Sequence, residues 1–295
     1  MRWIELSTTA DSGSVEKIDS ILRCFGRGGT AVEEWQPDNS NEKTFIVKIY
    51  LPHSRSYKET RRDIERSLST LSDSAPIHLR EQLLKPEDWL DSLKKHFSVV
   101  EIGPRFIIKP SWVSRTLSAD GRVVIELDPG AAFGTGLHPT TRLCLLALEK
   151  YLKPGMSILD LGTGSGILAI AAVKLGAARV LALDIDPVAV RAAGDNTKKN
   201  GTEGSVQVRR GTLSTRFQRQ NRRSFDLALA NITAKAIGDC SSGFASVLKT
   251  GGRLVASGIH AGGLDAVLIS LALAGFTIES IDREGEWDMV TAVNN

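Results

Sequence analysis

Two aspartates flank a glycine-rich turn near the middle of the 295-residue chain. Asp160 interrupts the apolar run of residues 157–161, and Asp184 ends the next apolar run. In the turn after the first run, glycine stands at every second position: Gly162, Gly164 and Gly166. Glycine accepts positive φ angles and lets a ligand lie against the backbone. Because a strand, a glycine turn and a helix bind nucleotide-like ligands in α/β sheets, this stretch predicts a nucleoside site.

The spacing of the glycines leaves the class of nucleoside open. A dinucleotide fingerprint fails when it is counted from Gly162, but the looser form ending in alanine fits from Gly164 to Ala169. The carboxylates favour S-adenosylmethionine instead. Asp160 has a negative charge that suits a cationic sulfonium better than a pyrophosphate, and Asp184 can accept both hydroxyls of a ribose. A plain βαβ turn without a ligand is the remaining alternative.

A second candidate segment, residues 133–141, reads Phe-Gly-Thr-Gly-Leu-His-Pro-Thr-Thr. Its flexible first part supplies three candidates for cofactor binding: Phe133, Gly134 and Thr135. Thr140 and Thr141 fall in the first turn of a predicted helix, where hydroxyls and free N–H groups bind carboxylates. The methionine end of S-adenosylmethionine carries such a carboxylate. An ordinary capped helix is the alternative, and for His138 we favour capping or packing over catalysis.

A third candidate is Asn231, which follows an apolar strand-like run and precedes Ile232 and Thr233. The amide oxygen of asparagine accepts hydrogen bonds from an incoming amine, which would aim the nitrogen lone pair at a methyl carbon. We therefore interpret Asn231 as the residue that orients the amine. The alternative is an asparagine that only turns the chain, and the sequence identifies no general base and no metal ligands.

Regular alternation of strands and helices from residue 122 onward positions these three segments. The predicted strands are residues 123–127, 157–161, 180–183, 206–209, 225–230 and 253–257. The predicted helices are residues 139–151, 167–175, 188–199, 234–248 and 264–273, and only the link from 206 to 225 lacks a clear one. This alternation predicts a parallel sheet covered by helices on both faces. Residues 276–281 and 287–293 add an antiparallel pair of strands.

The first 84 residues follow a different pattern, in which strands and helices have the order β-α-β-β-α-β. That order is typical of a ferredoxin-like domain, and it carries no cluster of residues suited to chemistry. We interpret residues 1–84 as a substrate-recognition domain, with a purely structural cap as the alternative. Residues 85–117 are interpreted as a connector, with a helix from 85 to 97 and strands at 99–102 and 105–109. Residues 118–295 would then form the catalytic domain.

The composition is that of an ordinary globular protein, with 42% hydrophobic and 24% charged residues. The net charge of +3 is too small to argue for DNA or membrane binding. The three cysteines are widely separated and lack the spacing of metal ligands, which indicates reduced thiols. The sequence shows neither the apolar core of a signal peptide nor a membrane span. We therefore expect a cytoplasmic protein. Six arginines lie between Arg209 and Arg223 with no acid among them, and for these we favour a solvated loop over contact with RNA.

The motifs together resemble one family. Residues 133–141, the run Asp-Leu-Gly-Thr-Gly-Ser-Gly-Ile-Leu-Ala-Ile-Ala from Asp160, and Asp-Ile-Asp-Pro from Asp184 are similar to those of PrmA-type methyltransferases. The resemblance covers the whole chain in layout and implies a Rossmann-like class I methyltransferase domain after a small α+β domain. It implies a mostly parallel sheet with an antiparallel terminal strand, and S-adenosylmethionine as cofactor. Cofactor contacts would fall on Thr141, Gly162, Asp184 and Asn231.

The resemblance also implies a substrate, because this family acts on the eleventh protein of the large ribosomal subunit. We therefore expect methyl transfer from S-adenosylmethionine to lysine side chains or the N-terminal amine of that protein. One rival is a methyltransferase of the same fold that acts on another protein or a small amine. The other rival is an inactive cofactor-binding partner in ribosome assembly, against which Asn231 and the segment 133–141 argue.

Overall fold

In a computed structural model, the chain is described over residues 3–11, 13–25, 30–35, 44–53, 57–69, 71, 77–84, 99–113, 121–127 and 138–295. The described residues before 85 belong to one compact unit, and those from Val99 onward belong to another. No helix within these ranges combines the length and apolar character needed to cross a membrane. Each unit is described below by itself.

The first unit has the predicted β-α-β-β-α-β order. Its elements are β1 (Trp3–Asp11), α1 (Val15–Phe25), β2 (Thr30–Trp35), β3 (Thr44–Pro52), α2 (Tyr57–Ser69) and β4 (Arg80–Leu84). The sheet order is β2-β3-β1-β4 and all neighbours are antiparallel, which confirms the ferredoxin-like arrangement. Leu22 of α1 and Ile64 of α2 are fully buried with Leu6 and Ile49 of the sheet, so the helices and strands share one apolar core.

Three short strands open the second unit: β5 (Val100–Ile102), β6 (Phe106–Lys109) and β7 (Val123–Glu126). β5 pairs antiparallel and β7 pairs parallel with β6. Phe106 and Ile125 are fully buried in the core that the second unit forms with its first helices. Asn200 locks the end of β7, because its side chain accepts from the amide of Glu126 at 2.9 Å and donates to its carbonyl at 2.8 Å. The predicted helix 85–97 lies outside the described residues.

A seven-stranded sheet, alternating with helices, makes up the rest of the second unit. Its elements in chain order are α4 (Pro139–Tyr151), β8 (Ser157–Leu161), α5 (Ile167–Lys174), β9 (Arg179–Asp184), α6 (Pro187–Lys199), β10 (Val206–Arg210), α7 (Thr215–Gln220), β11 (Phe225–Asn231), α8 (Ala234–Val247), β12 (Leu248–His260), a 3-10 turn (Ala261–Gly263), α9 (Leu264–Leu273), β13 (Phe276–Glu284) and β14 (Trp287–Asn294). The sheet order is β10-β9-β8-β11-β12-β14-β13. β14 runs opposite to the other six strands of this sheet, which confirms the predicted, mostly parallel sheet with an antiparallel terminal strand.

One helix of this unit, α7, was missed in the sequence. It has six residues and a single apolar side chain, Phe217, which is too few to produce a helical period. The side chain of Ser214 starts the helix by accepting a hydrogen bond from the amide of Phe217 at 3.3 Å. The arginine-rich segment is therefore partly helical rather than a loop throughout.

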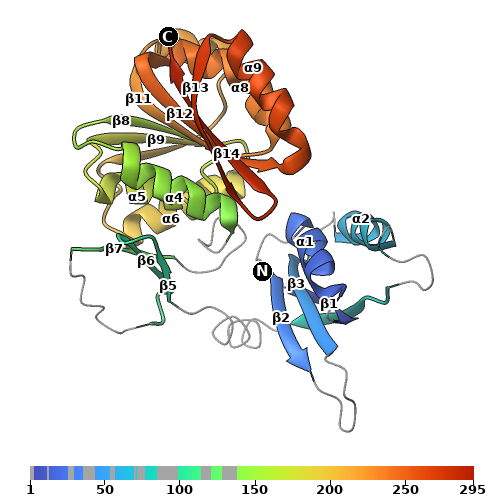
Figure 1. Cartoon of the computed structure of the whole chain (residues 1–295). Coiled ribbons are helices and arrows are strands. Elements are labelled where there is room, and N and C mark those ends of the chain that lie inside the picture. The colour runs from blue at the N-terminus through green and yellow to red at the C-terminus, as the bar shows by residue number, and fades with distance from the viewer. Residues whose placement is uncertain are drawn as a thin grey trace. The chain divides into compact units, whose positions relative to one another are not determined.

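The two faces of the large sheet are covered by different helices, α4 and α5 on one side and α8 and α9 on the other (Figure 1). Successive strand residues point to opposite faces, so Ile158 packs on the α4 side and Leu159 on the α8 side. The same alternation turns Asp160, Asn231 and Ser257 toward the α4 side. The sheet thus gathers its polar strand-end residues under the start of one helix.

Candidate functional site

The candidate site lies at the carboxyl ends of β8 and β11. The sheet order reverses between these two strands, and such a switch point is where open α/β sheets bind their ligands. The glycine turn follows β8 directly. Its three glycines have φ angles of 75°, 56° and 85° (Gly162, Gly164 and Gly166), all in the region that disfavours residues with a Cβ atom. The turn therefore requires glycine at each of the three predicted positions.

Asp184 holds its carboxylate against this turn. One carboxylate oxygen accepts from the amide of Gly164 at 3.0 Å, and the other accepts from the amide of Asp186 at 2.9 Å. The fold thus brings two of the predicted cofactor-binding residues together across neighbouring strands. An ionised carboxylate offers about four acceptor positions, so two remain for hydroxyl donors. This is the capacity that a ribose with two vicinal hydroxyls requires.

Asp160 is a buried carboxylate with one satisfied and one orphaned oxygen. Its side chain is 1% exposed, and its Oδ2 atom accepts from the hydroxyl of Thr163 at 2.6 Å. Its Oδ1 atom has no hydrogen-bond partner among the described residues. Burial, together with the nearby charge of Asp184, raises the pKa of Asp160 to about 7, against the lowering effects of the Thr163 hydroxyl and of the backbone amide of Ala169. A buried, orphaned carboxylate oxygen is unfavourable on its own, and a cation placed beside it would stabilise its ionised form.

Asn231 and Thr141 meet although they lie 90 positions apart in the chain. The side-chain nitrogen of Asn231 donates to the hydroxyl of Thr141 at 3.3 Å, and Thr141 is fully buried at the start of α4. Since the amide nitrogen faces Thr141, the amide oxygen of the half-buried Asn231 is the atom left to accept a further hydrogen bond. Two predicted site residues are thereby joined into one side-chain pair.

His138 caps helix α4, as the sequence interpretation favoured. Its Nδ1 atom accepts from the amide of Thr140 at 3.3 Å and lies 2.8 Å from the hydroxyl of the same residue. The amide of Thr141 donates to the His138 carbonyl at 3.0 Å. The amides and hydroxyls of this first turn are engaged within the protein, so a cofactor carboxylate would have to replace one of these contacts. Phe133, Gly134 and Thr135 lie outside the described residues.

Sequence reasoning missed Trp287 at the same edge of the sheet. Its half-buried ring packs edge-on against His138, with centroids 4.8 Å apart, and against His260 at 5.4 Å. Trp287 begins β14 directly opposite His260, the last residue of β12. The predicted antiparallel pair of final strands contained the signal, because an antiparallel strand begins at the edge where its parallel neighbours end.

Gly258 supports the Asn231 segment from the adjacent strand, and its replacement is our first testable prediction. Its φ angle is 85°, and an added Cβ atom would lie 2.2 Å from the carbonyl oxygen of Ile232. Gly155 is a matched control, with φ of 86° and nothing within 4 Å of an added Cβ. Both alanine variants adopt a left-handed backbone that costs about 1–2 kcal/mol. Gly258→Ala is expected to lose about 2 kcal/mol more because of overpacking.

Urea denaturation of the two variants measures this difference. Equal losses of unfolding free energy in Gly258→Ala and Gly155→Ala would show that the backbone of the Asn231 segment yields freely. Such a result would contradict the close contact between the two strand ends.

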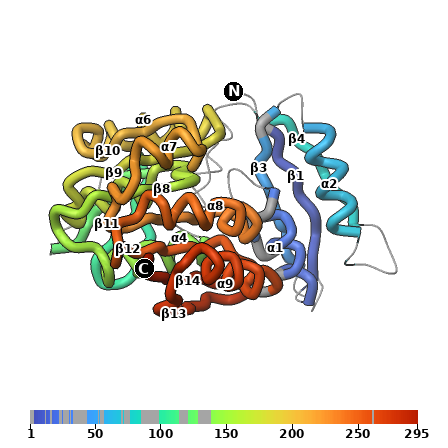
Figure 2. The backbone as a smooth tube through the Cα atoms, turned by 90° about the horizontal axis from the view of Figure 1, so that it is seen from above, coloured from blue at the N-terminus to red at the C-terminus, as the bar shows by residue number. Residues whose placement is uncertain are grey.

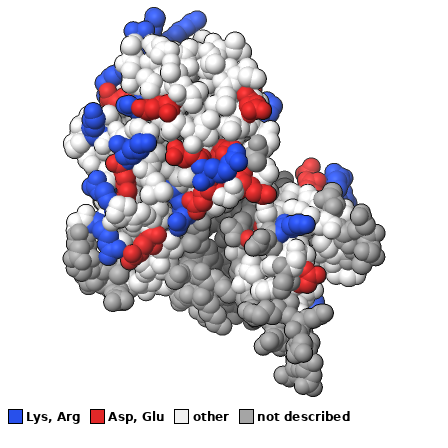
Figure 3. Space-filling model, in the orientation of Figure 1, with Lys and Arg blue, Asp and Glu red and all other residues white. Residues whose placement is uncertain are grey.

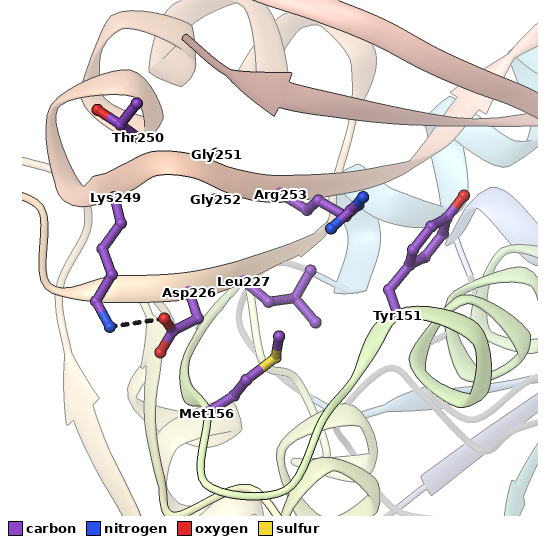
Figure 4. Close-up of a pocket in the computed structure, with 9 residues that line it drawn as sticks. All are labelled: Tyr151, Met156, Asp226, Leu227, Lys249, Thr250, Gly251, Gly252 and Arg253. Carbon is purple, nitrogen blue, oxygen red and sulfur yellow. Dashed lines mark hydrogen bonds and ion pairs between the residues drawn. The ribbon is translucent and has the colours of Figure 1, made fainter.

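A separate cavity of about 120 Å³ lies at the amino ends of the strands (Figure 4). It is lined by Tyr151, Met156, Asp226, Leu227, Lys249, Thr250, Gly251, Gly252 and Arg253. Lys249 reaches across to Asp226 at 2.6 Å, as the dashed line in the figure shows. Because this cavity is at the edge opposite to the glycine turn, it does not belong to the candidate site. Its ion pair ties the starts of β11 and β12.

Across the part of the chain that the structure describes, no three His, Cys, Asp or Glu side chains gather in a group able to hold a metal ion. Cys144 is buried and Cys240 half-buried, both as free thiols. Burial raises the pKa of the Cys144 thiol, and the charge of Asp160 raises it further. This thiol beside the site is therefore held in its protonated, unreactive form.

Comparison with known proteins gives a match over nearly the whole length. The family model described as ribosomal protein L11 methyltransferase (PrmA) matches residues 2–295. A ribosomal protein L11 methyltransferase from Pelotomaculum thermopropionicum is 36% identical over an alignment of 309 positions, which covers 99% of each chain. The protein of that name from Chloroflexus aurantiacus is 38% identical over an alignment of 319 positions, which covers 97% of this chain and 96% of the relative. The crystal structure of a ribosomal protein L11 methylase from Lactobacillus delbrueckii subsp. bulgaricus aligns with a TM-score of 0.62 and 34% identity, over 67% of this chain and 99% of that chain.

Proposed function

Because the chain belongs to the ribosomal protein L11 methyltransferase family, we propose that it methylates lysine side chains and the N-terminal amine of ribosomal protein L11. Membership makes the chain an S-adenosylmethionine-dependent protein methyltransferase. The observation that carries the proposal is the match over residues 2–295, which includes the segment 133–141, the glycine turn and Asn231. The nature and number of the methylated amines belong to the proposal alone.

The residues at this edge fit S-adenosylmethionine, which supplies an electrophilic methyl group on a positively charged sulfur. Asp184 would accept the ribose hydroxyls with the two acceptor positions that the backbone amides leave open. The orphaned oxygen of Asp160 would face a cationic part of the cofactor. The glycine turn would take the cofactor against its backbone. Thr141 and the segment that holds Phe133, Gly134 and Thr135 are proposed for the methionine end.

The amine side of the reaction is assigned to Asn231. A lysine has a reference pKa of about 10.4, so at pH 7 only about one in a few thousand is neutral and nucleophilic. Entry into a water-poor site lowers the pKa of an amine, and an α-amino group, near 8, needs less help. The amide oxygen of Asn231 would accept an N–H of the neutral amine. Since Thr141 fixes the amide at 3.3 Å, the nitrogen lone pair would be aimed rather than free to turn.

The first unit, with bounds at residues 1–84, is assigned to substrate recognition. Residues 85–117 are assigned as a connector and residues 118–295 as the catalytic domain. Support comes from its own four-stranded sheet and apolar core, which make it a separate folded unit. Two free thiols fit a cytoplasmic location. Methylation assays on a chain lacking residues 1–84 test recognition, and an unchanged KM for the protein substrate would contradict it.

Incubation with radiolabelled S-adenosylmethionine tests the function itself. Purified ribosomal protein L11 and a ribosomal protein extract are offered in parallel, and we expect label in L11 in both. Label in another protein, with L11 unlabelled, would favour a relative of the same fold with a different substrate. Cofactor binding without any transfer would favour an inactive assembly partner.

Asp184 provides a direct test of cofactor binding. Asp184→Ala removes a charged acceptor, and hydrogen bonds to charged groups contribute about 1.5–3 kcal/mol each. We expect the affinity for S-adenosylmethionine in calorimetric titration to fall by roughly 10- to 100-fold, with an unchanged far-ultraviolet circular dichroism spectrum. Asp195→Ala is the matched control, because Asp195 is exposed on the neighbouring helix α6. Equal affinities of the two variants would exclude the ribose role.

A further inference from the structure

A second hollow of the large unit lies away from the candidate site, between α7 and the last turns of α8. Its volume is about 400 Å³. Three arginines line it together with three hydroxyl side chains: Arg219, Arg222, Arg223, Thr215, Ser242 and Ser246. The two helices pack against each other (Figure 2). The hollow is toward the amino ends of the strands, because Arg223 stands just before β11 begins.

The positive charge of this arginine hollow is not balanced by the elements around it. All three arginines are exposed, and no acid occurs between Ser205 and Ser224. The flanking elements β11 and α8 contain one acid each, Asp226 and Asp239, and a lysine pairs with each at 2.6 Å. Among the described residues, none of the three guanidinium groups takes part in an ion pair. Elsewhere, acidic and basic side chains are interspersed, as on the face in Figure 3.

The backbone beneath these arginines is fixed. Arg223 has a φ angle of 49°, the single positive value among the described residues other than glycine. Its amide donates to the carbonyl of Ser246 at 3.0 Å, and the amide of Ser224 donates to Val247 at 2.8 Å. A backbone in this region persists only where its surroundings hold it. The guanidinium group of Arg219 therefore extends from α7, and those of Arg222 and Arg223 extend from a turn that is tied to the end of α8, unlike those of a solvated loop.

We propose that the arginine hollow binds phosphate groups of an RNA chain. Guanidinium forks match the oxygens of a phosphodiester, and serine and threonine hydroxyls are regular donors to phosphate and sugar. Arg216, also exposed, lies in the first turn of α7. Arg209 and Arg210 end β10 at the carboxyl edge of the sheet and are not part of this surface. The three arginines of the hollow can each contact a phosphate group.

The lining favours RNA over an acidic protein. Protein interfaces are anchored by apolar and aromatic side chains that fill pockets, and Ala245 is the one apolar residue that lines this hollow. A polyphosphate backbone is bound by charge and hydrogen bonds alone. The proposal is independent of the methyl-transfer chemistry, because the arginines precede β11 at the edge opposite to Asn231.

The test is binding of a fluorescent single-stranded RNA of about 20 nucleotides to the full chain, measured by anisotropy across salt concentrations. Three single-strand phosphate contacts contribute about −2 to the slope of log affinity against log salt. The triple variant Arg219→Gln, Arg222→Gln, Arg223→Gln is expected to bind at least roughly tenfold more weakly, with a slope about 2 units shallower. The control Lys153→Gln, Arg191→Gln, Lys198→Gln removes the same charge from exposed residues elsewhere and is expected to lose little.

Several outcomes would overturn the proposal. One is that the native chain does not bind RNA, and another is that the two triple variants lose RNA affinity equally. A third is complete displacement of the RNA by inorganic phosphate at matched ionic strength, which would indicate a small-anion site. A raised KM for ribosomal protein L11 with unchanged RNA affinity would assign the hollow to the protein substrate. Because Arg223 has an unusual backbone, the double variant Arg219→Gln, Arg222→Gln repeats the measurement, and it must show about two thirds of the change in slope. Cofactor affinity should be native in every variant, which separates this test from that of the proposed function.

Discussion

Replacing Asn231 with alanine should lower kcat for methyl transfer to ribosomal protein L11 by about a hundredfold or more. The side chain is held by Thr141 at 3.3 Å, so its amide oxygen has a fixed position from which to accept an amine N–H. Without it the amine enters with its lone pair unaimed, and misplacement of reacting atoms by about 1 Å costs on the order of a hundredfold. Cofactor affinity is expected to change much less than kcat.

Steady-state kinetics with labelled cofactor measure this effect, and two further variants define it. Thr141→Val keeps the shape of Thr141 but removes the acceptor for Asn231, so an intermediate loss of kcat is expected. Asn221→Ala is the control, because Asn221 ends α7 before the amino end of β11, at the edge of the sheet opposite to Asn231, and donates to Phe217 at 2.9 Å. A native kcat in Asn231→Ala would remove the amine-orienting role, whatever the protein substrate proves to be.

The second large effect concerns Asp160 and pH. The folded pKa of about 7 lies above the ordinary aspartate value of 3.8, so the folded chain binds the proton more tightly than the unfolded chain. The contribution of Asp160 to stability without cofactor therefore declines as pH rises from about 4 to 7, and is lowest above pH 7. Three pKa units correspond to about 4 kcal/mol. Asp160→Asn removes this penalty, so the variant is expected to gain stability relative to the native chain at pH 8.

Urea unfolding of the second unit at about pH 5 and pH 8 measures the effect. All other titrating groups are common to both proteins, so the difference between their two pH dependences isolates Asp160. Calorimetry should show the opposite trend for the ligand: native affinity for S-adenosylmethionine rises with pH toward 8, since the ionised carboxylate attracts a cation. Parallel stability curves for the native chain and Asp160→Asn would mean that the buried carboxyl does not titrate in this range.

Local sequence signals predicted most of the fold, because each depends on neighbours along the chain. Pro139 and the cap before it begin α4 as predicted, and the three alternating glycines occupy left-handed positions that only a tight turn requires. Asp186 caps α6 at the place where a strand gives way to a helix. The alternating apolar pattern predicted the strands and the helical pattern predicted the longer helices, whereas the six-residue α7 was too short to show a helical pattern.

The site could be predicted only in part, since its contacts depend on the order of strands in space. Nothing in the neighbourhood of Thr141 indicates that Asn231 will lie beside it; that contact follows from β8, β11 and β12 being adjacent. The pKa of Asp160 depends on how fully α4 and the sheet exclude water from it. Trp287 enters the site because β14 is antiparallel, so its first residue reaches the edge where the other strands end.

The position of β14 has a consequence for how the large unit forms. This strand follows β13 in the chain but lies between β12 and β13 in the sheet, so the sheet cannot assemble in chain order. Until β14 inserts, β12 and β13 each have an unpaired edge, and such edges recruit other chains. Asn294 at the end of β14 then donates to the carbonyls of Ala245 and Leu248, both at 3.0 Å. Insertion of β14 is thus the last step in assembly of the sheet, and its rate would decide how long a partly folded chain is exposed to aggregation.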